Sequence, residues 1–532
     1  MQSRVSKFVS QTLLSVASLC LGTSSFALFL DGSGHYGLRG EMRTAPGASS
    51  GRGLHQATDQ SFLLDAEARA NDAASFFLEF RLFDDPRNAY LGDSPLPRDC
   101  NGEESSCKDR DGKTRYQHSS EPGYKKYVPK VSKAYFSYAF DYCILDAGRR
   151  GRDWGLGLFM DSGTRPFSIA SSIYDGINCH VNLQKFQDMG VSFGIDKLAE
   201  TGRDIRSNPD DPAKPGPSNI KDDMDQYYFS IYLDDRTSHP NATFNKHIGF
   251  YVANIRSGAL DGGGAKTEMS VADMYLAFYF PRITWRNEFI FRLGKSADPN
   301  YLTLGGGYES SGEPTTNNLN AIGFGGNVDW LMSGPRSTQE SSPYASVSGN
   351  RHILFLDYAF APGDRDGYYN DFTGKTDLGI QKRDGYATAL AFHPNFSPAL
   401  ILFTGRSEID DLKVDGVFDP VRIMNAQVYS LGYRFEGVDI GNFETRLLYS
   451  FLNMTPQDEV INHYRTQKTK PVGYYGDELG LELDLKYWRS LSKGIDGGLA
   501  TGALFPGKAW QVEDEEQAKN SYLIQAFLTF NF

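Results

Sequence analysis

Beyond its first thirty residues the chain has no uninterrupted apolar run of the length that a membrane-spanning helix needs, about 20 residues. Its mean hydropathy is −0.44. The chain also has only nine histidines, and neither a G-x-S-x-G nor an H-E-x-x-H motif is present. We therefore expect neither a helical membrane protein nor an enzyme.

Cysteine is scarce, and its spacing excludes the usual metal sites. Of five cysteines one lies in the first twenty residues, and no C-x-x-C pair is present, so no metal and no other cofactor is expected. Cys100 and Cys107 lie in one polar stretch and are predicted to form a local disulfide. Cys143 and Cys179 fall on neighbouring predicted strands, where they either pair across the wall or remain free.

The N-terminus has the features of a secretory signal. Arg4 and Lys7 precede a mostly apolar stretch, and Ser25-Phe26-Ala27 is a small-x-small cleavage site, so residues 1–27 are predicted to be removed. The formal charge is −12, and loss of two bases and no acids gives −12 − 2 = −14 for the mature chain. This excess of acids argues against nucleic acid as a partner.

Strict alternation of apolar and polar residues is the dominant pattern. From Tyr522 to the final Phe532 every even position is apolar. Segments of this kind, about ten residues long, recur about twenty times from Gly34 onwards, a density typical of a transmembrane β-barrel. Tyr386–His393 is among the clear segments, and the weaker ones include 177–183, 321–329 and 400–408.

The connections between these segments alternate in length. Short ones such as Asn71-Asp72 take turns with long polar ones such as 83–130 and 453–475. Short periplasmic turns and long outer loops are typical of outer-membrane barrels. Segment 330–352 is an exception, because it is long yet falls on the periplasmic side. We predict an all-β fold, in which residues 28–532 form one antiparallel up-and-down barrel of about 18 strands (18–20).

Assigning the apolar positions of each strand to lipid directs the charged positions into the lumen. For residues 478–488 this places Leu479, Leu481 and Leu483 outward and Glu478 and Glu482 inward, so Leu483→Arg should impair insertion and Glu482→Gln should be tolerated. The predicted lumen and selectivity residues are Arg39, Glu41, Arg43, Asp65, Glu67, Arg69, Glu79, Arg81, Asp146, Arg150, Arg286, Glu288, Arg292, Glu444, Arg446, Glu482, Asp484 and Lys486.

These charges have two interpretations. They either line a water-filled channel and select its solutes, or pair with one another across neighbouring strands. Acids and bases are nearly equal in number, so no strongly anionic or cationic solute is indicated. A barrel of this width is too large for wall side chains to fill. The lumen is therefore open or occluded by loops, and segments 151–174 and 83–130 are the candidates for a constriction.

Two stretches resemble outer-membrane porins of the alginate-export family. Tyr142–Arg150 followed by Trp154-Gly155 is similar to one strand and loop of that family, and Gly480–Leu485 with Gly502–Trp510 is similar to its C-terminal hairpin. The resemblance implies a monomeric barrel of about 18 strands, in a family whose characterised members export an anionic polysaccharide. To reach that strand number, 177–183 and 321–329 are the segments to omit. Arg150 departs from the glutamine usual in the family.

These observations predict a porin-like channel in the outer membrane of a Gram-negative bacterium. It would pass hydrophilic solutes passively, anionic ones and saccharides included, and the direction of transport stays open. The alternatives are a surface-exposed structural or adhesive barrel that acts through its long loops, and a polysaccharide exporter gated by loops. The expected partners are outer-membrane lipid, lipopolysaccharide and the barrel-assembly machinery, which would bind the C-terminal Phe532.

Overall fold

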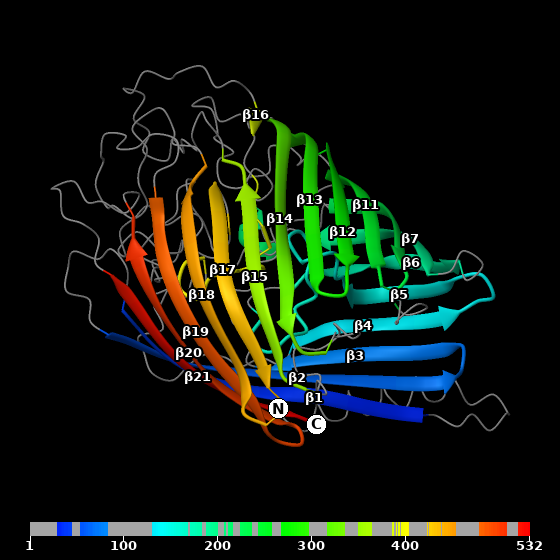
Figure 1. Ribbon diagram of the computed structural model, residues 1–532. Coiled ribbons are helices and arrows are strands. Elements are labelled where there is room, and N and C mark those ends of the chain that lie inside the picture. The colour runs from blue at the N-terminus through cyan, green and yellow to red at the C-terminus, as the bar shows by residue number, and fades with distance from the viewer. Residues whose placement is uncertain are drawn as a thin grey trace, which may run out of the picture.

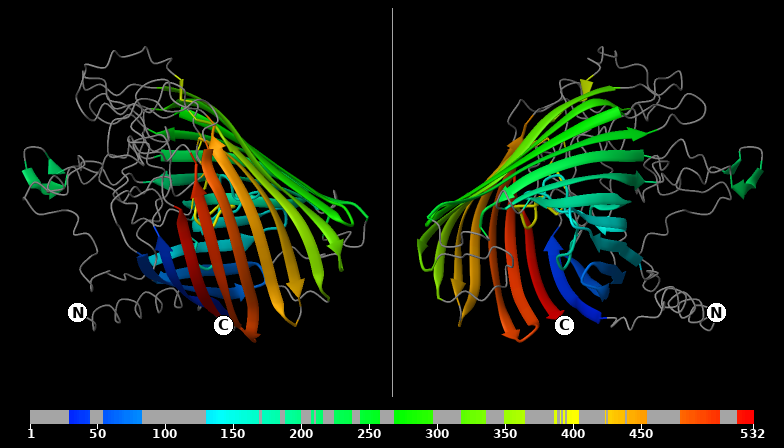
Figure 2. Two further views of the ribbon diagram at one scale, coloured as in Figure 1. Left: turned by 60° about the vertical axis from the view of Figure 1, so that its left-hand side comes forward. Right: turned by 90° about the vertical axis from the view of Figure 1, so that its right-hand side faces the viewer.

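Eighteen antiparallel strands form the wall of a closed barrel in the computed structural model (Figures 1 and 2). The last strand, β21 (Ser521–Asn531), pairs with the first, β1 (Phe29–Thr44), from the Asn531–His35 pair to the Leu523–Arg43 pair. Because lipid offers no hydrogen-bond partner to the backbone, a membrane-spanning sheet must close on itself. The all-β up-and-down barrel expected from the alternation is confirmed.

The wall follows the chain order but leaves out β8 and β9, which lie between β7 and β10, and β16, which lies between β15 and β17. Its remaining strands are β2 (Leu54–Asn71), β3 (Ala74–Leu82), β4 (Lys130–Ala139), β5 (Ile144–Gly151), β6 (Ile173–Leu183), β7 (Met189–Ala199), β10 (Met224–Asp234), β11 (Asn245–Ser257), β12 (Glu268–Tyr279), β13 (Ile283–Ser296), β14 (Asn317–Ser333), β15 (Arg351–Ala361), β17 (Ala426–Gly437), β18 (Gly441–Leu452), β19 (Glu478–Ser492) and β20 (Ile495–Pro506). A separate small hairpin joins β8 (Ser207–Asn208) to β9 (Asp211–Pro215).

The structure describes residues 29–44, 54–82, 130–168, 171–183, 188–199, 207–208, 211–215, 224–236, 243–257, 268–296, 317–335, 349–363, 386–387, 390, 392–393, 395–403, 423, 425–437, 439–453, 478–507 and 520–532. Within these residues no helix has both the length and the apolar character needed to cross a bilayer. The predicted signal peptide and the predicted Cys100–Cys107 disulfide lie outside them and stay predictions.

Two of the segments predicted as strands do not belong to the wall. The wall passes directly from β15 to β17, which pair from Arg351 opposite Glu436 onwards. Of the described residues of predicted strand Tyr386–His393 only β16 (Tyr386–Ala387) forms a strand, and it pairs in parallel with β14. The described part of predicted strand 400–408, residues 400–403, is not a strand either. Leu390, Phe392, Ile401 and Phe403 are buried inside the barrel, and burial selects apolar residues there as lipid does on the wall.

Omitting 177–183 and 321–329 from the strand count was wrong. Residues 177–183 belong to β6, and residues 321–329 lie in the middle of β14. The alternation of 321–329 is weak because glycines occupy several of its wall positions, including Gly323, Gly325 and Gly326 of β14. Side chains from inside the barrel lie against two of these glycines: Leu390 and Phe392 against Gly323, and Leu158 against Gly325.

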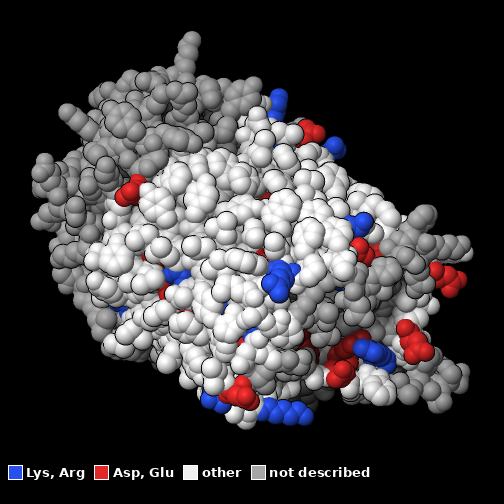
Figure 3. All heavy atoms as spheres, viewed as in Figure 1, with Lys and Arg blue, Asp and Glu red and all other residues white. Residues whose placement is uncertain are grey.

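The two faces of the wall differ in burial as the alternation requires. On β19, Leu481, Leu483 and Leu485 are between 37% and 45% exposed, whereas Glu482 is 0% exposed and Asp484 1%. In Figure 3 most of the described outer wall is formed by uncharged residues, and charged side chains gather mainly towards its two ends. Such a face suits the hydrocarbon of a membrane.

Exposed aromatic side chains ring the barrel at the end of the short turns. Phe140, Tyr142, Phe280 and Trp285 are among them. Across β11, β12 and β13 the rings meet, with Phe278 5.6 Å from Trp285 between centroids. Aromatic girdles of this kind mark the membrane–water interface of outer-membrane barrels. The short turns therefore lie at a membrane surface, and the described ends of the longer connection, residues 334–335 and 349–350, lie at the same end of the barrel.

A β-bulge reverses the predicted faces at the start of β19. Ser450 lies opposite Gly480 and Phe451 opposite Glu478, so Leu479 is an extra residue in the ladder. Leu479 is consequently 0% exposed inside the barrel, and Glu478 lies outside, where it accepts a hydrogen bond from the Tyr449 hydroxyl at 3.0 Å. Gly480 permits the bulge with φ +148°. The inward prediction for Glu478 and the outward one for Leu479 are corrected by this bulge.

Cys143 and Cys179 are free thiols in the structure. Cys179 lies on β6 opposite Leu145 of β5, and Cys143 precedes β5, so the two lie close together. The sequence left open whether Cys143 and Cys179 form a disulfide or remain free, and in the structure they are free.

Placing a charge on the lipid face of β19 should destabilise the barrel. We expect Leu483→Arg to lower the free energy of unfolding by about 2–4 kcal/mol, the cost of an arginine near the bilayer midplane. Urea unfolding in liposomes, followed by heat-modifiable gel migration, measures the change. Leu483→Phe, which stays apolar, is the control. Equal stability of the two variants would show that this face does not contact lipid.

Candidate constriction of the lumen

Residues 152–168, which follow β5, fold into the barrel; we call them the first inward segment. Leu158 and Met160 of this segment are 0% exposed. From one side of the wall Arg81 of β3 donates from Nη2 to the Ser162 carbonyl at 3.1 Å. From the far side Leu158 packs against Gly325 of β14, where an added Cβ would lie 3.1 Å from Leu158. The segment thus crosses the lumen from wall to wall, as predicted for 151–174.

A fully buried wall carboxylate, Glu288 of β13, holds this segment. Its Oε2 accepts from the backbone N–H of Leu156 and, at 3.4 Å, of Leu158, and its Oε1 accepts from Phe159 N–H at 3.3 Å. A buried charge is costly unless hydrogen bonds compensate it, and these amides provide them. Gly155 makes the approach possible, because a Cβ there would lie 2.4 Å from Oε2.

The base of the first inward segment is fastened by a buried arginine. Arg152 forms an ion pair with Asp196 of β7 at 2.8 Å. Its guanidinium lies 3.7 Å from the ring centroid of Tyr228 and 4.8 Å from that of Tyr174, and it donates to the Tyr251 hydroxyl at 3.3 Å. Enclosure by tyrosine rings strengthens such contacts, since cation–π attraction is larger when it is desolvated. The segment therefore leaves β5 in a defined direction.

Residues 390–403, between β15 and β17, also enter the barrel; we call their described part the second inward segment. Its anchor is again a buried wall carboxylate, that of Glu482 on β19. Glu482 Oε1 accepts from Leu400 N–H and Ile401 N–H, each at 2.6 Å, and Oε2 accepts from Leu402 N–H at 2.7 Å. Arg43 of β1 donates to the Ile401 carbonyl at 3.2 Å. Both segments thus attach to the wall by the same chemistry.

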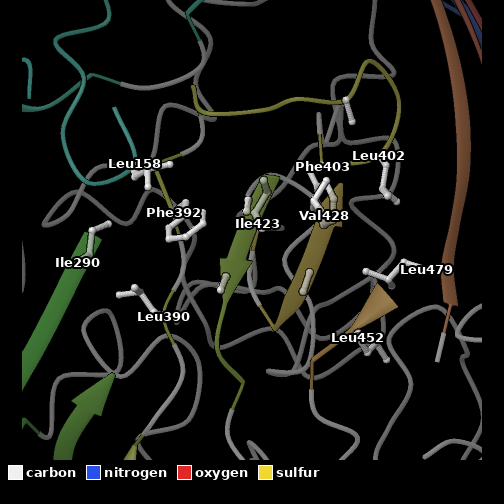
Figure 4. Packing of buried hydrophobic residues seen from close by; sticks show 14 of the residues in the cluster. Leu158, Ile290, Leu390, Phe392, Leu402, Phe403, Ile423, Val428, Leu452 and Leu479 are labelled. Carbon is white, nitrogen blue, oxygen red and sulfur yellow. The ribbon is translucent and has the colours of Figure 1, made fainter. Parts of the chain in front are cut away.

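The two inward segments are joined to each other. His393 N–H donates to the Leu158 carbonyl at 2.6 Å, and Asn395 Nδ2 donates to Asp161 Oδ1 at 2.8 Å. Around these bonds Leu158 and Phe392 belong to one apolar cluster with Ile290 and Val428 of the wall (Figure 4). Together the segments form one constriction, which is anchored at Glu288 on one side and at Glu482 on the other.

The structure places the predicted lumen charges in three groups. Five contact the inward segments: Arg39, whose guanidinium lies 4.6 Å from the Phe167 ring centroid, and Arg43, Arg81, Glu288 and Glu482. Others pair along the wall: Glu67 with Arg69, Glu79 with Lys133 and Arg81, Asp146 with Arg150, Arg286 with Asp329, and Glu444 with Arg434, Arg446 and Lys486. Of the rest, Glu41 accepts from Gln525 at 3.2 Å, Asp65 lies opposite Glu79, and Arg292 and Asp484 are buried.

Near the short turns the paired charges form a continuous network across β15, β17, β18 and β19. Arg434 bonds Glu444 at 2.9 Å, and Arg446 lies 3.0 Å from Glu444 and 3.6 Å from Asp357. Arg351 and Glu436 extend it at 2.7 Å. Acids and bases alternate in this network, so the field it presents to a solute is dipolar and has no strong excess of either sign.

Several residues of the constriction were not predicted from the sequence. Arg152 was missed because a charge in a loop carries no parity that would mark it as inward. Asp196 of β7 and the tyrosines around Arg152 lie on strands but were not named as site residues. Asp273, 0% exposed beside Glu288, lies on a strand whose alternation did show it as inward. His393 was predicted as the end of the strand Tyr386–His393 and instead joins the two segments. Among the described residues no three His, Cys, Asp or Glu side chains gather as ligands for a metal.

Comparisons with known proteins identify no family for this chain. No family profile and no curated protein matches it. Solved structures with a similar course include OccK8 (OprE) of Pseudomonas aeruginosa (10% identity, TM-score 0.43, covering 94% of this chain and 98% of that one) and OccAB1 of Acinetobacter baumannii (10%, 0.45, 94% and 97%). Another is Wzi of Escherichia coli (12%, 0.40, 93% and 84%), an outer-membrane protein involved in group 1 capsule assembly and described as a carbohydrate-binding β-barrel.

At these identities and TM-scores no property of those proteins carries over to this chain, and its resemblance to the alginate-export family stays a prediction. The chain's own geometry decides its class. A closed antiparallel barrel with an apolar outer face, an aromatic girdle and a charged interior is the architecture of bacterial outer membranes. This is an outer-membrane β-barrel protein.

Removing the second anchor should open the constriction. From the sequence, Glu482 was expected to be a lumen charge that tolerates replacement by Gln. Because its carboxylate accepts hydrogen bonds from three backbone amides, we now expect Glu482→Gln to release residues 400–402. Hydrogen bonds to charged groups are worth about 1.5–3 kcal/mol each, so the segment should detach while the wall stays closed. Single-channel recording should show a larger and noisier conductance.

Glu67→Gln is the matched control, because Glu67 pairs with Arg69 at 2.6 Å on the wall and makes no hydrogen bond or ion pair to the described residues of either segment. Unchanged conductance in Glu482→Gln, with gel migration that proves a folded barrel, would show that Glu482 does not hold the constriction.

Proposed function

We propose that this protein is a channel for the passive passage of small hydrophilic solutes across the outer membrane, with its bore set by the two inward segments. The observation that supports this most is the polar inner wall around a constriction that is anchored at both sides. A barrel with a merely structural role has no need of buried carboxylates that position loops inside it. Rigidly held loops at mid-barrel instead provide a defined passage.

The balance of lumen charge favours solutes without a large net charge. Most of the predicted selectivity residues pair with an opposite charge or contact the inward segments, which leaves no uninterrupted row of one sign among those that the structure describes. Paired charges still offer hydrogen-bond donors and acceptors to a passing polar molecule. We therefore assign the channel to hydrophilic solutes with weak ion preference, and uncharged saccharides are within this class.

The loop-borne alternatives rest on residues outside the described part of the chain. Adhesion through long loops, and gated export of an anionic polysaccharide, thus stay predictions. For assembly we propose that Phe532 engages the barrel-assembly machinery and that the barrel acts as a monomer in contact with lipid and lipopolysaccharide. Phe532 is 60% exposed beside the closing seam, where its backbone pairs with Gly34 at 2.9 and 3.0 Å.

The refolded protein should conduct in a planar bilayer. We expect steady openings and a reversal potential close to zero in a salt gradient. Lys486→Glu should shift the reversal potential towards cation preference, because Lys486 faces the lumen charge network near Glu444. Lys493→Glu, the same change in the exposed turn between β19 and β20, is the control and should leave selectivity unaltered. A folded barrel that never conducts would contradict the proposed channel.

A further inference from the structure

One sector of the inner wall, formed by β6, β10, β11 and β12, is rich in aromatic rings. Near the short turns it presents His180, Tyr232, His247, Tyr275 and Tyr279. Next to the constriction it presents Tyr174, Tyr228 and Tyr251, over which Trp154 of the first inward segment lies. We call these residues the aromatic stripe.

The stripe runs along the barrel axis. Tyr228 and Tyr232 are four residues apart on β10, a rise of about 13 Å. At the end near the short turns the ring centroids of His180 and Tyr232 lie 5.8 Å apart with planes only 7° from parallel, and those of His247 and Tyr275 lie 5.0 Å apart. At the end near the constriction the ring centroids of Trp154 and Tyr251 lie 5.6 Å apart. The rings therefore lead from the short-turn mouth to the constriction.

Two rings of the stripe, those of Tyr232 and Trp154, lie against glycines of the wall and are only partly buried. A Cβ added to Gly190 of β7 would lie 2.3 Å from Cζ of Tyr232, and one added to Gly249 of β11 would lie 3.0 Å from the Trp154 ring. Neither Tyr232 nor Trp154 is fully buried. Because both side chains lie inside the barrel, the part of each ring that remains exposed faces the lumen.

Polar groups whose charges cancel border the rings near the short turns. Arg236 binds Asp234 through two bonds of 2.8 and 2.6 Å and donates to the Tyr279 hydroxyl at 3.1 Å. The Tyr232 hydroxyl lies 3.2 Å from His180 Nε2. Side chains of Asp234 and Arg236 remain 19% and 28% exposed. Flat apolar faces bordered by neutral pairs of donors and acceptors complement a molecule with the same two features.

Pyranose rings have those features, with C–H groups on their faces and hydroxyls at their edges. We propose that the aromatic stripe binds neutral saccharide chains and guides them along the axis to the constriction. The inference rests on the proposed channel function and specifies its solute class. An ionic solute would instead follow the paired charges of β13 to β19, on another sector of the wall.

Maltohexaose, a linear neutral oligosaccharide, is the probe, with two independent readouts. Isothermal titration calorimetry on the folded barrel in detergent measures binding, and interruption of single-channel current measures entry into the lumen. Tyr232→Ala should weaken binding about ten-fold, equivalent to about 1.4 kcal/mol, and shorten the interruptions. Tyr232→Phe keeps the ring and should bind as the parent does.

The matched control is Tyr227→Ala, which removes the same ring from the lipid face of the same strand, where Tyr227 is 47% exposed. It should leave both readouts unchanged. Absence of calorimetric binding by the parent, equal binding by Tyr232→Ala, or binding only of an anionic chain such as oligogalacturonate would each overturn the saccharide inference. Tyr232-dependent binding in a barrel that never conducts would instead leave the stripe standing and contradict the channel.

Discussion

Buried carboxylates that accept backbone N–H groups are the interaction on which the interior of this barrel depends. A wall strand cannot pair with a loop in the lumen by ladder hydrogen bonds, because its own backbone is already used in the sheet. Glu288 and Glu482 solve this by presenting an anionic acceptor from a side chain to three amides of a passing loop. Because these carboxylates are shielded from water, the bonds are not weakened by competition with solvent.

The wall and the interior follow from different physical requirements. Lipid outside and polar groups inside impose a period of two on every wall strand, so the requirement is local and repeats along the chain. The interior depends instead on meetings between residues far apart in sequence, such as Leu158 with His393, or Arg43 with Ile401. The alternation of the wall can therefore be recognised in any window of ten residues, whereas the contacts of the interior cannot.

This difference explains which expectations from the sequence held. Alternation predicted the barrel, its inward and outward faces and the two kinds of connection. It failed where apolar residues were buried for another reason, as at Leu390 and Phe392, which were assigned to a wall strand but pack inside. It failed again at the Leu479 bulge, because one extra residue shifts the parity without changing the pattern on either side. Segment 151–174 was one of two candidates for a constriction, but the residues that anchor it were not predicted in that role.

The second inward segment also lies across the seam at which the barrel closes. It contacts Glu482 of β19 and Arg43 of β1, and Ile401 lies within 3.3 Å of a Cβ added to Gly502 of β20. These strands flank both sides of the β21–β1 pairing. Separation of the first strand from the last therefore also requires that this segment lose its contacts either with β1 or with β19 and β20. The segment therefore acts as an internal brace, which raises the barrier to opening and makes the closed barrel long-lived in kinetic terms.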